Sequence, residues 1–478
     1  MTHDPLRPEG TPPESPSTDP ERLVDEEEVA AGEAEEDEGF EDEEENGAGE
    51  DDAPDPLDAP VPEAPPPADA REPEPVPAAL WESEADHLDA SVPQAGAGAQ
   101  AEIDPRLLDV DAVKVINRLV QNGHRAYLVG GCVRDLLLGR TPKDFDIATS
   151  ALPSEVRGTF RNCRLIGRRF RLAHIYFKGG KIIEVSTFRA NPITDLEPAA
   201  DGGVGEERPE DLLINDDNVF GTAEQDARRR DFTINGLFYD VPAGRVLDFV
   251  RGRRDLDERL VRTIGDPERR MREDPIRLLR AVRFASRLSF EIEPRTYAAM
   301  EGAVEDLPRC APPRLLEDTF RILRGGVAEP GLELLAALDA LRFLLPPIDA
   351  YLKEHGPEGE RTLVAFARAA DRRVKAGELL EDAVLLAVLL VPLLEAAPEA
   401  SPEAPGGVPE AVETMLQDLV KGARLPRRIA ERCRMMLLAQ STLSGRRRRR
   451  GSLGSFRRHP LFQEALTVFA CTVEATGK

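Results

Sequence analysis

The sequence predicts an α+β protein in which a small mixed-sheet head precedes an all-helical body, behind an N-terminal tail that does not fold. Three observations carry this prediction. The first 102 residues hold 33 acidic and only 3 basic residues. Short apolar strands then alternate with helices to about residue 265, and almost everything later has helical apolar spacing. The predicted regions are a tail (1–102), a head (103–265), a neck and body (266–350) and an arginine-rich C-terminal region (351–478).

The tail combines strong like charge with little apolar surface. Its net charge of −30 exceeds the −27 of the whole chain, so the remaining residues are close to neutral. Such a segment buries too little apolar surface to offset the entropy of ordering, and we expect residues 1–102 to be disordered.

The composition also argues against several classes of protein. No stretch reaches the roughly 18 apolar residues of a membrane span, and the N-terminus lacks the cationic start and apolar core of a signal peptide. The five cysteines form no CxxC pair, and the six histidines have no zinc-like spacing. We therefore expect a cytoplasmic protein with neither a disulfide framework nor a zinc site.

The head elements follow one another closely. Helical spacing runs through residues 103–123 and ends at Gly123. The elements predicted after it are a strand (126–129), a helix (132–138), a strand (144–150), a helix opened by Pro153, a glycine-turn hairpin (173–177 and 182–188) and a strand (232–239). Residues 190–218 are polar and too long for a turn, which predicts a mobile loop. Residues 397–410 and 443–455 have the composition of loops within the helical half.

Two carboxylates stand out in the strand "DFDIATS" (144–150). Residues i and i+2 of a strand point to the same face, so Asp144 and Asp146 would present their carboxylates together. Unscreened, the two charges would repel each other, whereas a bound divalent cation removes that cost. Hard oxygen ligands with open positions suit Mg²⁺, which also takes phosphate oxygens. The alternative is a surface strand that carries two solvated acids.

A glycine turn precedes these carboxylates by about 15 residues. Gly130 and Gly131 let the backbone approach a ligand closely, and the helix that follows begins with free N–H groups. Arg134 lies one turn into that helix. The combination suits a triphosphate placed beside the metal.

These residues carry a resemblance to a known family. "LVGGCVRDLLLGRTPKDFDIATSA" (128–151) resembles the signature of class II nucleotidyltransferases, the superfamily of bacterial poly(A) polymerases and CCA-adding enzymes. "RRRDFTINGLFYD" (228–240) and "REDPIRLLRAVRFASRLSF" (272–290) resemble two further motifs of that family. The resemblance covers roughly residues 125–350 and implies a nucleotidyltransferase head.

The resemblance implies a role for each motif residue. Asp144 and Asp146 would be the metal carboxylates, with Asp231 as the third acid of the site. Two alternatives stay open at the third position. Glu184 is a competing acid on the hairpin, and Asp231 could instead only pair with one of the three preceding arginines, 228–230.

The helix predicted over residues 273–290 begins at Asp274, which can cap it, and Pro275, which fits a first turn. By resemblance, Asp274 and Arg277 would read the Watson–Crick edge of the incoming base, as an acceptor and a planar donor. Four arginines at spacings of three and four would share one stripe, either solvated or in contact with triphosphate and RNA: Arg277, Arg280, Arg283 and Arg287.

Two segments bear on which member of the superfamily this is. "LIGRRFRLAHIYF" (165–177) is similar to the segment that marks bacterial poly(A) polymerases, ending at His174. Residues 421–478 carry 14 Lys and Arg against 3 Glu, which suits sequence-independent contact with RNA phosphates. A solvated basic helix face is the alternative.

The sequence thus predicts a template-independent polynucleotide adenylyltransferase that uses ATP, Mg²⁺ and RNA 3′ ends. Its expected setting is a cytoplasmic monomer that promotes RNA decay together with decay proteins. The first alternative is a CCA-adding tRNA nucleotidyltransferase, and the second is a non-catalytic RNA-binding protein.

Overall fold

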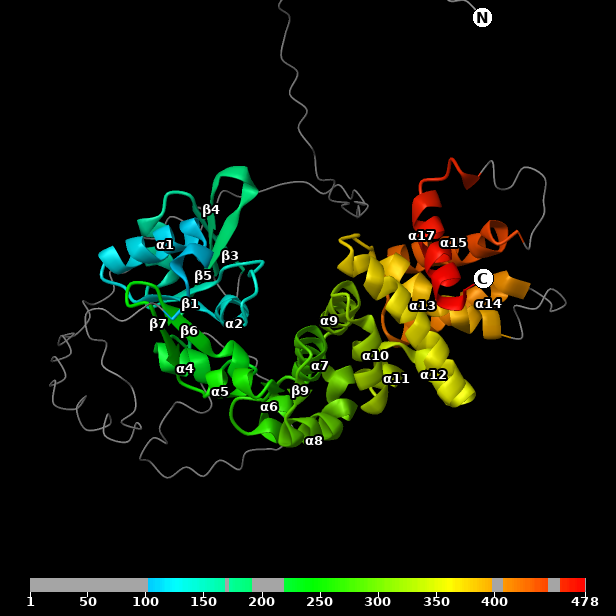
Figure 1. The fold of residues 1–478 in the computed structure, drawn as a ribbon, viewed down its shortest axis with the longest axis horizontal. Coiled ribbons are helices and arrows are strands. Elements are labelled where there is room, and N and C mark those ends of the chain that lie inside the picture. Colours follow the sequence, from blue (N-terminus) through cyan, green and yellow to red (C-terminus); the bar gives the residue numbers. More distant parts are fainter. Residues whose placement is uncertain (1–101, 168–171, 191–218, 398–406, 446–455, 478) are drawn as a thin grey trace, which may run out of the picture. The chain divides into compact units, whose positions relative to one another are not determined.

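The computed structural model describes residues 102–167, 172–190, 219–397, 407–445 and 456–477 (Figure 1). Several predictions fall outside these ranges: nearly all of the predicted tail, residues 191–218 of the predicted loop, positions 168–171 of the 165–177 segment, and the arginine run 446–450. All the described residues belong to one compact unit, residues 93–478. The domain boundaries given above stay predictions.

The head holds a seven-stranded mixed sheet. Its strands are β1 (Ala126–Val129), β2 (Ile147–Thr149), β3 (Cys163–Ile166), β4 (Leu172–Tyr176), β5 (Ile182–Thr187), β6 (Leu237–Asp240) and β7 (Arg245–Asp248). They lie in the order β3-β4-β5-β2-β1-β6-β7. The β2–β5 pair is parallel and all other neighbours are antiparallel. The predicted hairpin is confirmed as β4 and β5.

Helices cover both faces of this sheet. On one face lie α1 (Val110–Gln121) and α3 (Pro153–Thr159). Asp109 caps α1 by accepting hydrogen bonds from two backbone N–H groups at 3.0 Å, and the side chains of one stripe are buried. The other face carries α4 (Ala223–Arg228) over an aromatic cluster of Tyr127, Phe188 and Phe238. The helix predicted over 103–123 is interrupted, with a 3₁₀ turn at Pro105–Leu107 before α1.

Two predicted strands begin later than expected. Strand β2 starts at Ile147, so Asp144 and Asp146 lie on the extended segment that leads into it, where the Asp146 carbonyl accepts the Val129 N–H at 3.0 Å. After Asp231 the chain forms a 3₁₀ turn, Thr233–Asn235, before β6 begins at Leu237. In both places a segment that lines the cavity stands where the start of the strand was predicted.

From residue 249 onward the chain is mainly helical, which confirms the predicted helical body (Figure 1). The helices are α5 (Gly252–Asp257), α6 (Pro267–Glu273), α7 (Ile276–Leu288), α8 (Pro294–Ala303), α9 (Pro312–Arg324), α10 (Ala328–Ala337), α11 (Leu341–Leu344), α12 (Pro346–Lys375), α13 (Asp382–Ala396), α14 (Gly407–Gly422), α15 (Arg427–Leu443) and α17 (Phe462–Thr476). A short parallel pair joins β8 (Leu260–Val261), which precedes α6, to β9 (Glu291–Ile292), which follows α7. Residues 407–410, predicted as loop, belong to α14.

Helix α13 is the centre of the C-terminal body. Its residues from Ala383 to Leu394 are all buried, because α9, α12, α15 and α17 pack around it. Among the described residues, no helix is both long and apolar enough to cross a membrane.

Part of the basic charge in the C-terminal region is neutralised within the protein. Arg432 pairs with Glu464 at 2.7 Å, and Arg434 pairs with Glu431 at 2.6 Å. The predicted excess of positive charge is therefore reduced at these two positions, while Arg427, Arg428 and Arg457 stay exposed.

Candidate active site

One large cavity brings the predicted site residues together. It has a volume of about 1410 Å³ and is bounded on one side by the head and on the other by helices of the neck. All eight residues singled out from the sequence line it: Gly130, Gly131, Arg134, Asp144, Asp146, Asp231, Asp274 and Arg277. Residues far apart in the chain thus meet at one place.

The glycine turn brings the backbone close to a neighbouring arginine. Gly130 has φ of 72° and ψ of −127°, a conformation that favours glycine, and its N–H donates to the Leu237 carbonyl at 3.0 Å. A Cβ on Gly130 would lie 2.8 Å from Nη1 of Arg230. The first turn of α2 (Gly131–Leu137) therefore faces the cavity without side-chain cover from these two glycines.

The carboxylates of Asp144 and Asp146 both face the cavity. Neither forms an ion pair with any described residue. Asp146 is open toward the cavity and surrounded by protein elsewhere, and this burial, together with the charges of Glu184 and Asp144, raises its pKa to about 6 against the opposing effect of Arg230. The pair therefore carries negative charge that the described side chains do not balance.

Glu184 is the acid nearest to this pair in sheet register. Strand β5 pairs in parallel with β2, Val185 opposite Ile147, and the same register continued by one residue sets Glu184 beside Asp146. The Glu184 side chain is half exposed, and its Oε1 lies 3.4 Å from Nε2 of His174 on β4. Glu184 thus joins Asp144 and Asp146 at the same wall of the cavity.

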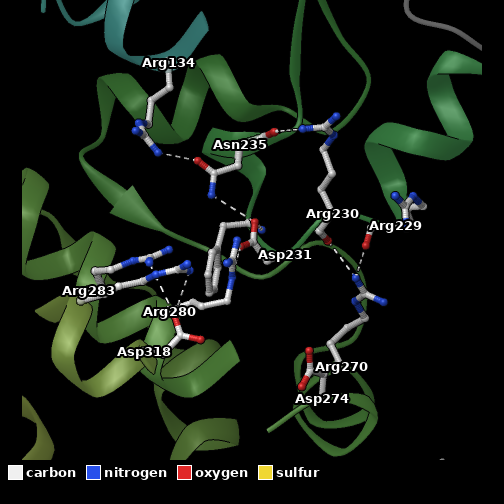
Figure 2. A network of polar contacts seen from close by, with 12 residues as sticks. Arg134, Arg229, Arg230, Asp231, Asn235, Arg270, Asp274, Arg280, Arg283 and Asp318 are labelled. Carbon is white, nitrogen blue, oxygen red and sulfur yellow. Dashed lines mark hydrogen bonds and ion pairs between the residues drawn. The ribbon is translucent and has the colours of Figure 1, made fainter. Parts of the chain in front are cut away.

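Unlike Asp144 and Asp146, Asp231 is bound by several groups of the protein (Figure 2). Its Oδ2 accepts hydrogen bonds from Nε and Nη2 of Arg280 at 2.8 and 2.5 Å, and its Oδ1 accepts from Nδ2 of Asn235 at 3.0 Å and from the Phe232 N–H at 2.8 Å. Burial alone would raise its pKa, but the charge of Arg280 and these hydrogen bonds lower the pKa to about 2. Both carboxylate oxygens are occupied by protein donors.

Arg280, and not one of the three preceding arginines, is the partner of Asp231. Arg228 pairs with Glu224, and Arg229 and Arg230 both pair with Asp226, at 3.1 and 2.9 Å. The alternative that Asp231 only balances these arginines is therefore wrong. Its place as a third catalytic acid stays a prediction.

A chain of contacts continues from Asp231 to Arg134 and Phe284. Asn235 Oδ1 accepts from Nη1 of Arg134 at 2.6 Å, and Asp135 binds the other side of that guanidinium at 2.7 and 2.8 Å. The guanidiniums of Arg134, Arg280 and Arg283 lie 5.2, 5.7 and 5.0 Å from the centroid of the Phe284 ring. One aromatic ring therefore contacts three cations at the cavity wall.

The two residues expected to read the base stand at the junction of α6 and α7. Arg277 is buried, with Nη1 donating to the Arg270 carbonyl and to Oε2 of Glu273 at 3.3 Å. Asp274 accepts from Nη2 of Arg314 at 3.0 Å. The predicted capping of α7 by the Asp274 side chain is wrong, because the N-cap is Pro275 and has no side-chain hydrogen bond. Asp274 does not cap the helix and lines the cavity instead.

Comparison with known proteins agrees with this geometry. Residues 126–262 match a family model described as "Poly A polymerase head domain", and residues 289–352 match "Probable RNA and SrmB- binding site of polymerase A". The chain is 43% identical to Poly(A) polymerase I of Salmonella typhimurium over 60% of this chain and 61% of that protein. It is 37% identical to Poly(A) polymerase I of Escherichia coli over 78% of this chain and 80% of that protein.

The chain belongs to the poly(A) polymerase I family. Its match to the Salmonella relative spans about three fifths of that protein's length. Among solved structures, the Bacillus stearothermophilus CCA-adding enzyme in complex with CTP is similar at a TM-score of 0.56 and 28% identity, over 77% of this chain and 78% of that one.

The four-arginine stripe of α7 lies along the neck wall of the cavity, as predicted from its spacing. Arg277, Arg280, Arg283 and Arg287 all line it. The two later arginines contact acids at longer range. Arg283 contacts Asp318 and Arg287 contacts Asp135, each at 3.5 Å. The stripe is not a purely solvated face, because Arg277 is buried and the Arg283 side chain is only 17% exposed.

Sequence reasoning missed two residues that organise the site. Asn235 joins Arg134 to Asp231, and Phe284 underlies three guanidiniums. Both lie within the quoted family motifs, but nothing in the local pattern separates Asn235 from a turn residue or Phe284 from a core residue. Their roles depend on partners elsewhere in the chain.

The described residues contain no group of three or more His, Cys, Asp and Glu side chains placed to hold a metal ion. The predicted carboxylate trio of Asp144, Asp146 and Asp231 is therefore not assembled as a cage. A site built on the first two acids, with open positions for other ligands, is what the arrangement can offer.

Proposed function

We propose that this protein is a template-independent RNA adenylyltransferase that transfers AMP from ATP to RNA 3′ ends with release of pyrophosphate. The single observation that carries the proposal is the shared cavity, in which the glycine turn, the carboxylate pair and the Asp274–Arg277 pair face one space. Membership of the poly(A) polymerase I family supports it. So does the similarity of residues 165–177 to the segment that marks bacterial poly(A) polymerases.

Asp144 and Asp146 would hold Mg²⁺. The fit rests on chemistry present in the site: two oxygen donors face the cavity, no described cation pairs with them, and the pKa of Asp146 is raised to about 6. When bound, the metal supplies positive charge beside the attacking and leaving oxygens. Asp231 has both carboxylate oxygens engaged by protein donors, whereas the half-exposed Glu184 lines the cavity beside the pair.

The other residues act on the nucleotide by position and charge. The α2 N-terminus and its glycine turn receive phosphate oxygens, and Arg283 and Arg287, whose contacts with acids are as long as 3.5 Å, balance the triphosphate. Asp231 holds Arg280 in place, so it is a positioning residue in this scheme. Asp274 and Arg277 present an acceptor and a planar donor to the base, each fixed by its own partner.

A two-substrate assay tests the proposal against its nearest rival. The rival is a CCA-adding tRNA nucleotidyltransferase, favoured by the similarity to the Bacillus stearothermophilus enzyme bound to CTP. We expect long adenosine ladders on a generic RNA with ATP. Additions of three residues, confined to tRNA without its CCA end and dependent on CTP, would overturn the proposal.

A second assay separates the enzyme from a non-catalytic RNA-binding protein. Labelled ATP should be incorporated by the wild type and not by Asp144→Ala or Asp146→Ala. Full incorporation by both variants would favour the binding protein. Action in the cytoplasm as a monomer, together with RNA-decay proteins, belongs to the same proposal and is tested by fractionation and co-purification with the intact chain.

A further inference from the structure

One part of the cavity has no role in the function proposed above. It lies along the head wall, where the start of α1 meets the start of β5, and is lined by Leu107, Leu108, Lys181 and Ile182. Leu107 and Ile182 are apolar but 52% and 42% exposed. We call Leu107, Leu108 and Ile182 the apolar rim. Exposed apolar side chains that line a cavity indicate a surface that a ligand covers.

An ion pair joins the two chain segments that carry the residues of the apolar rim. Lys181 Nζ donates to Oδ2 of Asp109 at 2.5 Å and to Oδ2 of Asp111 at 3.0 Å. Asp109 is also the N-cap of α1, so the pair fastens the start of α1 to the start of β5. Because two carboxylates already engage the single positive charge of Lys181, this side chain is not a free binding group for phosphate.

The apolar rim adjoins the candidate catalytic acids. Ile182 and Glu184 are both exposed, on either side of the buried Ile183, and therefore share one face of β5. Glu184 in turn lies beside Asp146 in the sheet register. A ligand on Ile182 would thus reach the carboxylates at which the new phosphodiester bond forms in the proposed reaction.

The charged groups on the two walls of the cavity indicate which part of the substrates lies against the apolar rim. On the neck wall, Arg283 and Arg287 contact acids only at 3.5 Å, so their guanidiniums can also receive triphosphate oxygens. In an in-line displacement the attacking hydroxyl approaches opposite the leaving pyrophosphate. The attacking hydroxyl belongs to the last nucleotide of the RNA, whose ribose and base then lie toward the head wall.

We propose that the apolar rim binds the 3′-terminal nucleoside of the RNA through the face of its base. This inference rests on the proposed function and adds a subsite to it. Every base has an apolar π-face, so contact with Leu and Ile side chains accepts any terminal base, whereas hydrogen bonds to base edges would select one. Such a surface fits an enzyme that extends RNA ends of unrelated sequence.

Steady-state kinetics of Ile182→Thr and Leu107→Gln test the subsite. We expect the KM for a short RNA to rise about fivefold in each variant, since apolar area is lost from the contact. The KM for ATP should not change. Val110→Thr is the matched control, because Val110 is 67% exposed and close to the rim in sequence but does not line the cavity. Its kinetics should equal those of the wild type.

The variant Ile182→Trp gives a readout that does not depend on activity. An indole at this position stacks on the terminal base, so we expect a KM for RNA about fivefold lower and quenching of its fluorescence by RNA. The wild type, whose single tryptophan is Trp81, provides the background signal. Quenching by ATP alone with none by RNA, or an unchanged KM for RNA in both polar variants, would overturn the proposal.

The two proposals fail in distinguishable ways. A wild type that extends no RNA with ATP contradicts the proposed function, while the fluorescence titration of Ile182→Trp with RNA still decides whether the rim is an RNA surface. An active wild type with no quenching and no KM effect contradicts the subsite alone.

Discussion

The head wall and the neck wall of the cavity carry charge in opposite ways. On the head wall, Asp144 and Asp146 face the cavity without a cationic partner among the described residues. On the neck wall, Arg277 and Arg280 are each held by a carboxylate, Glu273 and Asp231. Asp144 and Asp146 therefore lack a counter-charge within the described part of the protein, whereas Arg277 and Arg280 have one.

Two aspartates show the same contrast in their protonation. Burial and the charge of Glu184 raise the pKa of Asp146 to about 6. The Asp231 side chain is only 9% exposed, but Arg280 and its hydrogen bonds lower its pKa to about 2. We infer that unbalanced charge marks the place where a ligand supplies the opposite charge, whereas balanced charge marks the framework that orients side chains.

The largest expected effect comes from the head wall. Asp144→Asn and Asp146→Asn should each lower AMP incorporation at least about a thousandfold, because a metal ligand is lost. The free energy of unfolding should stay the same or rise, since mutual repulsion is relieved. Radiolabel incorporation and urea denaturation measure the two quantities. Asp257→Asn, at an exposed carboxylate outside the cavity, is the control and should be active. A lower free energy of unfolding in Asp144→Asn or Asp146→Asn would contradict the view that these two charges are unbalanced in the protein.

On the neck side, removing a balanced charge should instead destabilise the fold. Asp231→Asn leaves Arg280 without its carboxylate, and breaking such a largely buried pair costs about 3 kcal/mol of unfolding free energy. Urea denaturation at neutral pH measures the loss. The double variant Asp231→Asn, Arg280→Gln should recover part of it, since no unpaired charge then remains. An Asp231→Asn variant of wild-type stability and no activity would point to a direct catalytic role.

The same pair predicts a pH dependence with a defined sign. Asp231 has a pKa of about 2 in the fold, below the ordinary value near 4, so the unfolded chain binds the proton more readily. Its stabilisation is therefore present above about pH 4 and lost as the pH falls toward 2. We expect the stability difference between wild type and Asp231→Asn to shrink over this window in acid-dependent denaturation. A difference that stays constant down to pH 2 would exclude the ion pair as its source.

The smallest expected effect concerns the ring beneath the arginines. Phe284→Leu removes the aromatic face that contacts Arg134, Arg280 and Arg283. A cation–π contact is worth at least about 0.5–1 kcal/mol, and loss of about 1 kcal/mol in the positioning of the nucleotide-binding arginines corresponds to a KM for ATP about fivefold higher, with little change in kcat. Phe284→Tyr should keep the wild-type value. Phe290→Leu, a buried change outside the cavity, is the control for loss of packing.

The members of the site could be named from the sequence because short motifs carry their own geometry. The glycine turn needs a backbone conformation that glycine tolerates, and Gly130 adopts it. The arginine stripe of α7 follows from helical periodicity, which places residues three and four apart on one side. Asp231, Asp274 and Arg277 were chosen through the resemblance to a known family, and they line the same cavity as the residues chosen from local patterns.

The partners of those residues were decided by the tertiary structure. Asp231 meets Arg280 across 49 positions, and Arg134 meets Asn235 across 101. Parallel pairing of β2 with β5 sets Glu184 beside Asp146. A local pattern specifies which side chains face together within one element, but a contact between distant elements depends on how their surfaces pack. The sequence by itself therefore determined which motif residues are candidates for the site, because periodicity and turn geometry act within one segment. Packing between distant segments decided which of their charges are balanced by the protein.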